Sequence, residues 1–126
     1  MSTAEKGLYP PYAHARVLTI GSIVFRGANG ADPTAANTED PGKMINAVTR
    51  TAEGVYNVPL KRRYAMVHAV SGHSSDADDH VSVTTVTDGG GAANSIVVTC
   101  QTGAGTNDDL DAKNITVVFL CYGSTS

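Results

Sequence analysis

The stretch VTRTAEGVYNVPL, residues 48–60, constrains the fold more than any other part of the chain. Two runs rich in β-branched and aromatic residues flank the tripeptide AEG. Its glycine, Gly54, can take the positive φ that a short hairpin loop with a bulge requires. The sequence therefore predicts a β-hairpin with strands over 44–51 and 54–60. Pro59 cannot donate to a β-ladder, which places it at an edge or a strand end.

Similar runs recur along the chain, and the composition agrees with them. The sequence holds 14 Val, 14 Thr and 5 Ile but only 5 Leu, and β-branched side chains fit a pleated, half-buried surface. The run over 15–27 is one strand or two strands that meet at Gly21. Further strands are expected over 64–72, 80–87, 95–102 and 114–123. This pattern predicts an all-β fold, an antiparallel β-sandwich of about seven or eight strands that is jelly-roll-like.

An immunoglobulin-like sandwich is the main rival, although the chain has no Trp for the usual core position. The length of 126 residues and the lack of a linker predict one domain over 15–126. Residues 1–14 are expected to form an extended N-terminal arm, because YPPY favours an extended backbone. Its residues, Tyr9, Pro10, Pro11 and Tyr12, suit docking onto another surface. Packing of the arm along its own domain is the alternative.

Charge is spread unevenly between the two halves of the chain. Residues 1–63 carry eight Lys or Arg and five Asp or Glu, whereas residues 64–126 carry one Lys and seven Asp. This asymmetry would allow charge-complementary contact between identical subunits, and acidic loops that keep a domain soluble explain it equally well. The only basic run is Lys61-Arg62-Arg63, so no nucleic-acid partner is expected. No stretch has the length of a membrane span, and the N-terminus lacks a signal-peptide pattern, so no membrane association is expected.

The two cysteines lie on strand-like segments. Alternation points Cys100 and Cys121 inward, where buried reduced thiols are expected. If the segments 95–102 and 114–123 formed a hairpin, antiparallel register would keep the two thiols apart, which disfavours a disulfide.

Few residues suggest chemistry. The loop 73–79, with His80 after it, brings two histidines and three aspartates together, which could ligate a divalent metal, but its spacing matches no known metal loop. His68 lies within a strand-like run and is interpreted as a core or interface histidine. No nucleophile elbow or phosphate loop is present. We therefore expect no enzymatic activity, no cofactor and no functional metal, and an enzyme built on the His73–His80 loop ranks last.

Three features of the region 15–122 carry a resemblance. One is the strand and loop IGSIVFRGANGADPTAANTED, and another is the final strand in NITVVFLCYGSTS. The third is the hairpin pattern formed by Arg50, Gly54, Tyr56, Val58 and Leu60. With these features the chain resembles small virion proteins of tailed bacteriophages, namely capsid decoration or cement proteins and related head or tail modules.

The resemblance implies a homotrimer that binds and stabilises the phage head, with the major capsid protein as its partner. The protein would then be located on the capsid surface of the virion after assembly in the host cytoplasm. The expected partner-binding residues are the arm residues Tyr9, Pro10, Pro11 and Tyr12, together with Lys61, Arg62 and Arg63. The alternative is a tail or appendage module that recognises a glycan or a host receptor.

Overall fold

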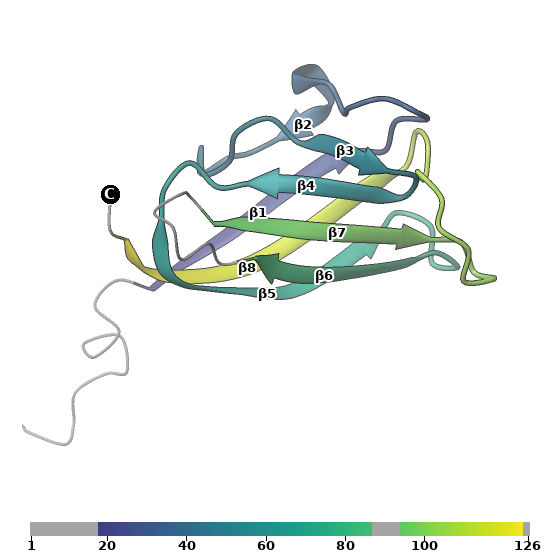
Figure 1. Ribbon diagram of the computed structural model, residues 1–126. Helices are drawn as coiled ribbons and strands as arrows, with labels where there is room; N and C mark the ends of the chain where they lie inside the picture. Colours follow the sequence, from purple (N-terminus) through teal and green to yellow (C-terminus); the bar gives the residue numbers. More distant parts are fainter. Residues whose placement is uncertain (1–17, 87–93, 125–126) are drawn as a thin grey trace, which may run out of the picture.

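The computed structural model describes residues 18–86 and 94–124 and contains a two-layer β-sandwich (Figure 1). A single turn of 3-10 helix, η2 (Ala35–Asn37), precedes the short strand β2. The strands are β1 (Leu18–Arg26), β2 (Thr38–Glu39), β3 (Thr49–Ala52), β4 (Val55–Pro59), β5 (Tyr64–Ser74), β6 (His80–Val86), β7 (Ser95–Gln101) and β8 (Asn114–Ser124). Among the described residues, no helix is long and apolar enough to cross a membrane.

Each sheet has four antiparallel strands. One has the order β2-β1-β8-β5 and the other β3-β4-β7-β6. The first and last long strands pair in one sheet, β4 and β7 pair in the other, and the chain crosses between sheets after β2, β4, β5 and β7. This nesting is jelly-roll-like. The prediction of an all-β antiparallel sandwich is therefore confirmed.

The predicted hairpin around Gly54 is present, with a shorter first strand than expected. β3 pairs with β4 across a tight turn, the register shifts between Arg50 and Ala52, and Gly54 has a φ of 73°. The expected strand over 44–51 is wrong for residues 44–48, which form a loop joined to the end of β4 by a single bridge between Ile45 and Leu60. This loop still contributes buried apolar side chains to the core.

Two further expectations are settled by the register. β1 is one continuous strand, because Leu18 to Arg26 pair without a break with Tyr122 to Asn114. Gly21 serves packing instead of a bend, since a Cβ there would lie 2.3 Å from Cζ of Phe119. A hairpin between 95–102 and 114–123 does not form, because the chain crosses from β7 in one sheet to β8 in the other.

The core lies between the inward faces of the two sheets. Alternate residues of β4, β7 and β8 are fully buried, and the rings of Phe25 and Tyr56 meet edge to face with centroids 5.1 Å apart. Cys100 and Cys121 are buried and free, as predicted. The two cysteines are separated because they belong to opposite sheets. The expected reason, the register of a hairpin between their strands, does not apply.

Candidate functional site

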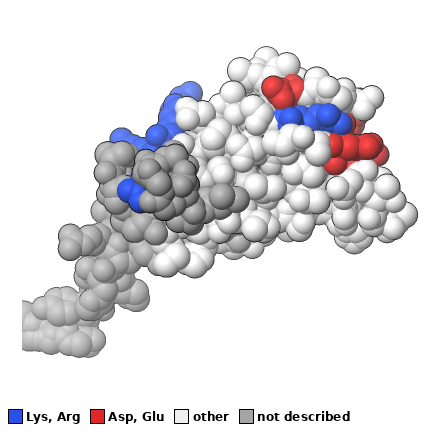
Figure 2. Space-filling view, in the orientation of Figure 1, with Lys and Arg blue, Asp and Glu red and all other residues white. Residues whose placement is uncertain are grey.

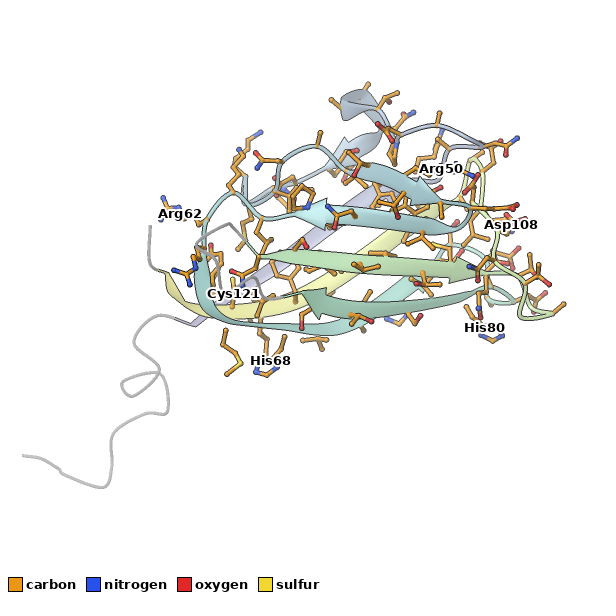
Figure 3. All side chains as sticks on the ribbon, viewed as in Figure 1. Arg50, Arg62, His68, His80, Asp108 and Cys121 are labelled. Carbon is orange, nitrogen blue, oxygen red and sulfur yellow. The ribbon has the colours of Figure 1, made fainter. Side chains whose placement is uncertain are left out.

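On the face of the sandwich that Figure 2 shows, charged side chains gather at the two ends and the middle is nearly uncharged. Figure 2 shows Lys and Arg at the end where β4 turns into β5, and Asp and Glu with further basic atoms at the opposite end. Figure 3 places Arg62 at the first end and Asp108 at the second. The charge asymmetry of the sequence is thus a separation in space, because the turn 60–63 and the acidic loops leave opposite ends of the strands.

Asp109 organises the acidic end as a structural hub. Its side chain is 5% exposed and accepts hydrogen bonds from the backbone amides of Gly54 at 2.7 Å and Gly30 at 2.9 Å, and from Nε of Arg50 at 2.9 Å. The hydroxyl of Tyr56 donates to the carbonyl oxygen of Asp109 at 2.7 Å. The loop between β7 and β8 is therefore fastened to the hairpin and to the loop after β1.

These contacts predict a dependence of stability on pH. Burial raises the pKa of Asp109, but the hydrogen bonds from Arg50, Gly54 and Gly30 outweigh it and hold the pKa below its ordinary value of 3.8. Because the folded-state pKa is lowered, the stabilisation is present above the unfolded-state pKa and is lost as the pH falls through the folded-state pKa. We expect the free energy of unfolding to decline below about pH 4, as measured by urea denaturation, and to decline less steeply in Asp109→Asn. Equal slopes for the two proteins would contradict this assignment.

The loop proposed as a possible metal site is held by a lysine. Nζ of Lys113 lies 2.7 Å from a carboxylate oxygen of Asp79 and 3.1 Å from one of Asp76. His73 belongs to β5, not to the loop as expected, and both His73 and His80 are exposed. No cluster of three or more potential metal ligands occurs among residues 18–86 and 94–124. In the structure these two carboxylates form ion pairs with Lys113.

A groove at the opposite end has the features of a partner-binding site. It has a volume of about 400 Å³ and is lined by Thr19, Ile20, Gly42, Lys43, Met44, Lys61, Arg62 and Tyr64. We call it the basic groove, because three of its side chains are cationic and none is acidic. A neighbouring cavity of about 350 Å³ shares Lys43 and Lys61 with it. The two lysines therefore border both hollows. Asp40 lines the second one as well, so only the basic groove lacks an acidic lining residue and could take an acidic segment.

The backbone around the basic groove is well fixed. The carboxylate of Asp40 accepts hydrogen bonds from the amides of Met44 at 2.9 Å and Ile45 at 3.0 Å, and the amide of Lys61 donates to the carbonyl of Met44 at 2.9 Å. These bonds hold the loop 40–45 against the turn after β4. Lys43 is thereby placed beside Lys61, although the two lie in different loops.

Lys43 adopts an uncommon backbone conformation, with a φ of 53°. A non-glycine residue in the left-handed region costs roughly 1–2 kcal/mol, and residues under such strain tend to occur at functional sites. We expect Lys43→Gly to leave the free energy of unfolding unchanged or to raise it by up to about 1 kcal/mol, measured by urea denaturation. Ala112→Gly, at a φ of 63° far from the groove, is the matched control. If Lys43→Gly clearly lowered the free energy of unfolding and Ala112→Gly did not, the Lys43 side chain would stabilise the fold, and its role would not be limited to the groove.

The structure brings together part of the predicted site. Lys61 and Arg62 line the basic groove, and Arg63 is half-buried in the same turn. Tyr9, Pro10, Pro11 and Tyr12 lie outside the described residues, as does the predicted arm as a whole. The sequence reasoning missed Lys43 and Tyr64. The motif Asp-Pro-Gly-Lys at 40–43 was the available signal, because it marks a turn that ends in a lysine.

His68 was interpreted as a core or interface histidine, and the core reading is wrong. It is exposed, and Figure 3 shows its side chain directed away from β5. The alternate residue set, which includes Val67, faces the core instead. Both sets in this run are mostly apolar, so alternation alone did not indicate which one is buried.

The perturbed groups of the described chain have structural explanations. Burial is the main cause that raises the pKa of Cys100 to about 12 and that of Tyr56 to about 12. Burial also raises the pKa of Cys121. A thiol that remains protonated within the core is a poor nucleophile. The charged pairs at the acidic end hold loops together, so the basic groove is the feature that is best suited to a partner.

Comparison with known protein families, curated protein sequences and solved structures gives no match to this chain.

Proposed function

We propose that this protein is a non-enzymatic virion structural protein, a capsid decoration or cement protein that binds the head of a tailed bacteriophage as a homotrimer. The basic groove is the observation that carries the proposal, because Lys43, Lys61 and Arg62 line it together and none of its lining residues is acidic. A groove with this charge suits an acidic surface of the major capsid protein. The domain is held by two packed sheets, which suits a clamp between neighbouring subunits.

Position supports the same proposal. Thr19 and Ile20, at the start of β1, line the basic groove. Residues 1–17 therefore join the domain next to it, and an N-terminal arm attached at this point would reach the same partner surface. Each trimer would offer three grooves and three arms, and later contacts become effectively intramolecular, which raises the overall affinity.

Binding to the capsid is tested with shells of the major capsid protein that the same genome encodes. We expect the wild-type protein to co-sediment with these shells and Lys61→Gln/Arg62→Gln to bind up to about thirtyfold more weakly, since each exposed ion pair contributes up to about 1 kcal/mol. The matched control is Ser82→Glu/Thr84→Glu, which changes the net charge equally at exposed positions of β6. Equal binding by both double variants would contradict the role of the groove, and no binding by the wild type would contradict the proposed function.

The arm is tested separately in the same assay. Deletion of residues 1–14 is expected to abolish shell binding and to leave the circular-dichroism spectrum of the folded domain unchanged. Retained binding after the deletion would remove the arm from the account, although the groove and the role would stand.

Recognition of a glycan has less support. Sugars usually stack on exposed aromatic rings, but Phe25, Tyr56 and Phe119 are fully buried. Tyr64 is the one described aromatic side chain with exposed surface, and it lines the basic groove. A strong and specific signal on a glycan array would place the appendage module ahead of the capsid role.

A further inference from the structure

The outer face of the sheet β2-β1-β8-β5 carries an apolar surface. Ile20, Met66 and Val70 are 69%, 41% and 55% exposed, and they are the large hydrophobic side chains exposed among residues 18–86 and 94–124. All three lie on β1 or β5. Register places them on one side of the sheet, because Ile20 is opposite Leu120 and Leu120 is opposite His68. Met66 precedes His68 by two residues and so shares its face, while Val70 is the extra residue of a bulge two positions later.

The part of this face around Ile20 carries no Asp, Glu, Lys or Arg side chain. The next row beyond Ile20 holds Ser22, Val118 and Ser71, and the one following it contains Val24 and His73 opposite Thr116. Charge begins at that row, where Glu39 of β2 is opposite Val24, and continues with Arg26 at the acidic end. Charged partners would lose hydration on such a surface without compensation. An uncharged apolar face is instead complementary to a copy of itself, which would bury the exposed side chains.

The edge of this sheet is less suited to association than its face. β5 is the outermost strand, and its register with β8 shifts between Ala69 and Ser71. A bulge in an edge strand disfavours the addition of another strand. Val70 is exposed at this bulge, where a second sheet packed on the face could cover it.

We propose that copies of this chain associate through the outer face of β1, β8 and β5, centred on Ile20, Leu120 and His68, with their strands parallel. The parallel arrangement rests on the proposed function. It places every basic groove at one end of the oligomer, where all of them can reach one shell surface, and places the acidic loops at the other end. An antiparallel pair would direct its two grooves in opposite directions, and only one could bind.

The two arrangements differ in their response to salt. Parallel copies bring like charges together at both ends, so salt should screen the repulsion and strengthen association. Antiparallel copies bring Lys61 and Arg62 near the acidic loops of the neighbour, so salt should weaken association. An eleven-residue strand such as β8 spans roughly 35 Å, which is well beyond the Debye length of about 8 Å. The charges at the basic and acidic ends of one domain therefore do not interact with each other.

The interface is tested by analytical ultracentrifugation of the full chain. We expect the wild type to sediment as a multiple of its 13.0 kDa chain mass, and Val70→Lys and Met66→Lys to dissociate at least tenfold more readily (about 1.4 kcal/mol). Thr84→Lys, at an exposed position on the other sheet, is the matched control and should behave as the wild type. Circular dichroism establishes that each variant is folded. A monomeric wild type, or oligomers that withstand both face variants, would overturn the proposal.

The orientation is tested with a spin label at Arg62→Cys, since the two native thiols are buried. Parallel copies should give a label-to-label distance well below the length of the sandwich, and association should strengthen with salt. A distance close to that length, with association weakened by salt, would overturn the parallel arrangement. If deletion of residues 1–14 dissolved the oligomer while Val70→Lys did not, the arm would hold the copies together and the face would be excluded.

These results separate this inference from the proposed function. An oligomer that depends on Val70 but fails to bind shells would preserve the interface and refute the capsid role. A monomer that binds shells through Lys61 and Arg62 would preserve the role and refute the interface.

Discussion

Replacement of Asp109 with alanine is expected to lower the free energy of unfolding by about 3–5 kcal/mol, because removal of one partner leaves buried polar groups unpaired. The amides of Gly54 and Gly30 would lose their acceptor, and Arg50 would lose its ion pair. A domain of this size has only about 5–15 kcal/mol of stability in total. Thermal unfolding followed by circular dichroism should show a melting temperature lower by roughly 10–20 °C.

A control in the same loop shows whether the loss of stability is specific to Asp109 or follows from the removal of any carboxylate. The side chain of Asp111 accepts one exposed hydrogen bond, from the amide of Asn29 at 3.1 Å. Asp111→Ala should therefore cost about 1 kcal/mol or less. Similar melting temperatures for the Asp109 and Asp111 variants would contradict the claim that Asp109 holds the loops of the acidic end together.

Replacement of Gly54 with alanine should have the next largest effect, a loss of about 2–5 kcal/mol from left-handed strain and a backbone clash together. Gly54 has a φ of 73°, and a Cβ there would lie 2.6 Å from the carbonyl oxygen of Cys100 and 2.7 Å from the amide nitrogen of Asp108. Neither backbone atom can move without displacing β7 or the loop after it. Urea denaturation of the two proteins measures the difference.

Gly105 offers a matched comparison for Gly54. Its φ is 85°, and a Cβ there would meet nothing within 4 Å. Gly105→Ala should therefore cost only the strain of the left-handed conformation, roughly 1–2 kcal/mol. Equal losses in the two variants would mean that the close approach at Gly54 contributes nothing.

Much of the fold could be predicted from local sequence patterns. The runs on either side of AEG predicted the hairpin, and Gly54 predicted its turn. Cys100 and Cys121 were placed inward by alternation along their strands. Some failures were local, such as the strand expected over residues 44–48, but the largest concerns distant segments: no local signal shows that β7 and β8 belong to different sheets. That separation follows from their other neighbours, β4 and β1, which lie far away in the chain.

The candidate site was less predictable, because it is assembled from separate loops. Lys61 and Arg62 were visible as a basic run, whereas Lys43 joins them only when the loop 40–45 folds against the end of β4. Asp109 is one of several acidic residues in its loop, and its partners Gly54 and Gly30 lie 55 and 79 residues away. A sequence shows that such a loop is acidic but not which carboxylate is buried.

The separation of charge links the fold to the proposed role. The acidic loops use part of their charge to hold the β7–β8 connection to the rest of the domain, through Arg50 and Lys113. The basic groove has no such internal partner among its lining residues. Under the proposed function this charge would face an acidic surface of the capsid protein, and the weakly charged region around Ile20 would pack against copies of the chain.

The most direct test of the proposed virion role is cryo-electron microscopy of gradient-purified virus particles from a source whose genome encodes this chain. The account predicts density for the β-sandwich on the outside of the head, with the turn that contains Lys61 and Arg62 toward the major capsid protein and the acidic loops toward solvent. Particles that lack the protein, or that carry it with the acidic loops against the shell, would contradict the account.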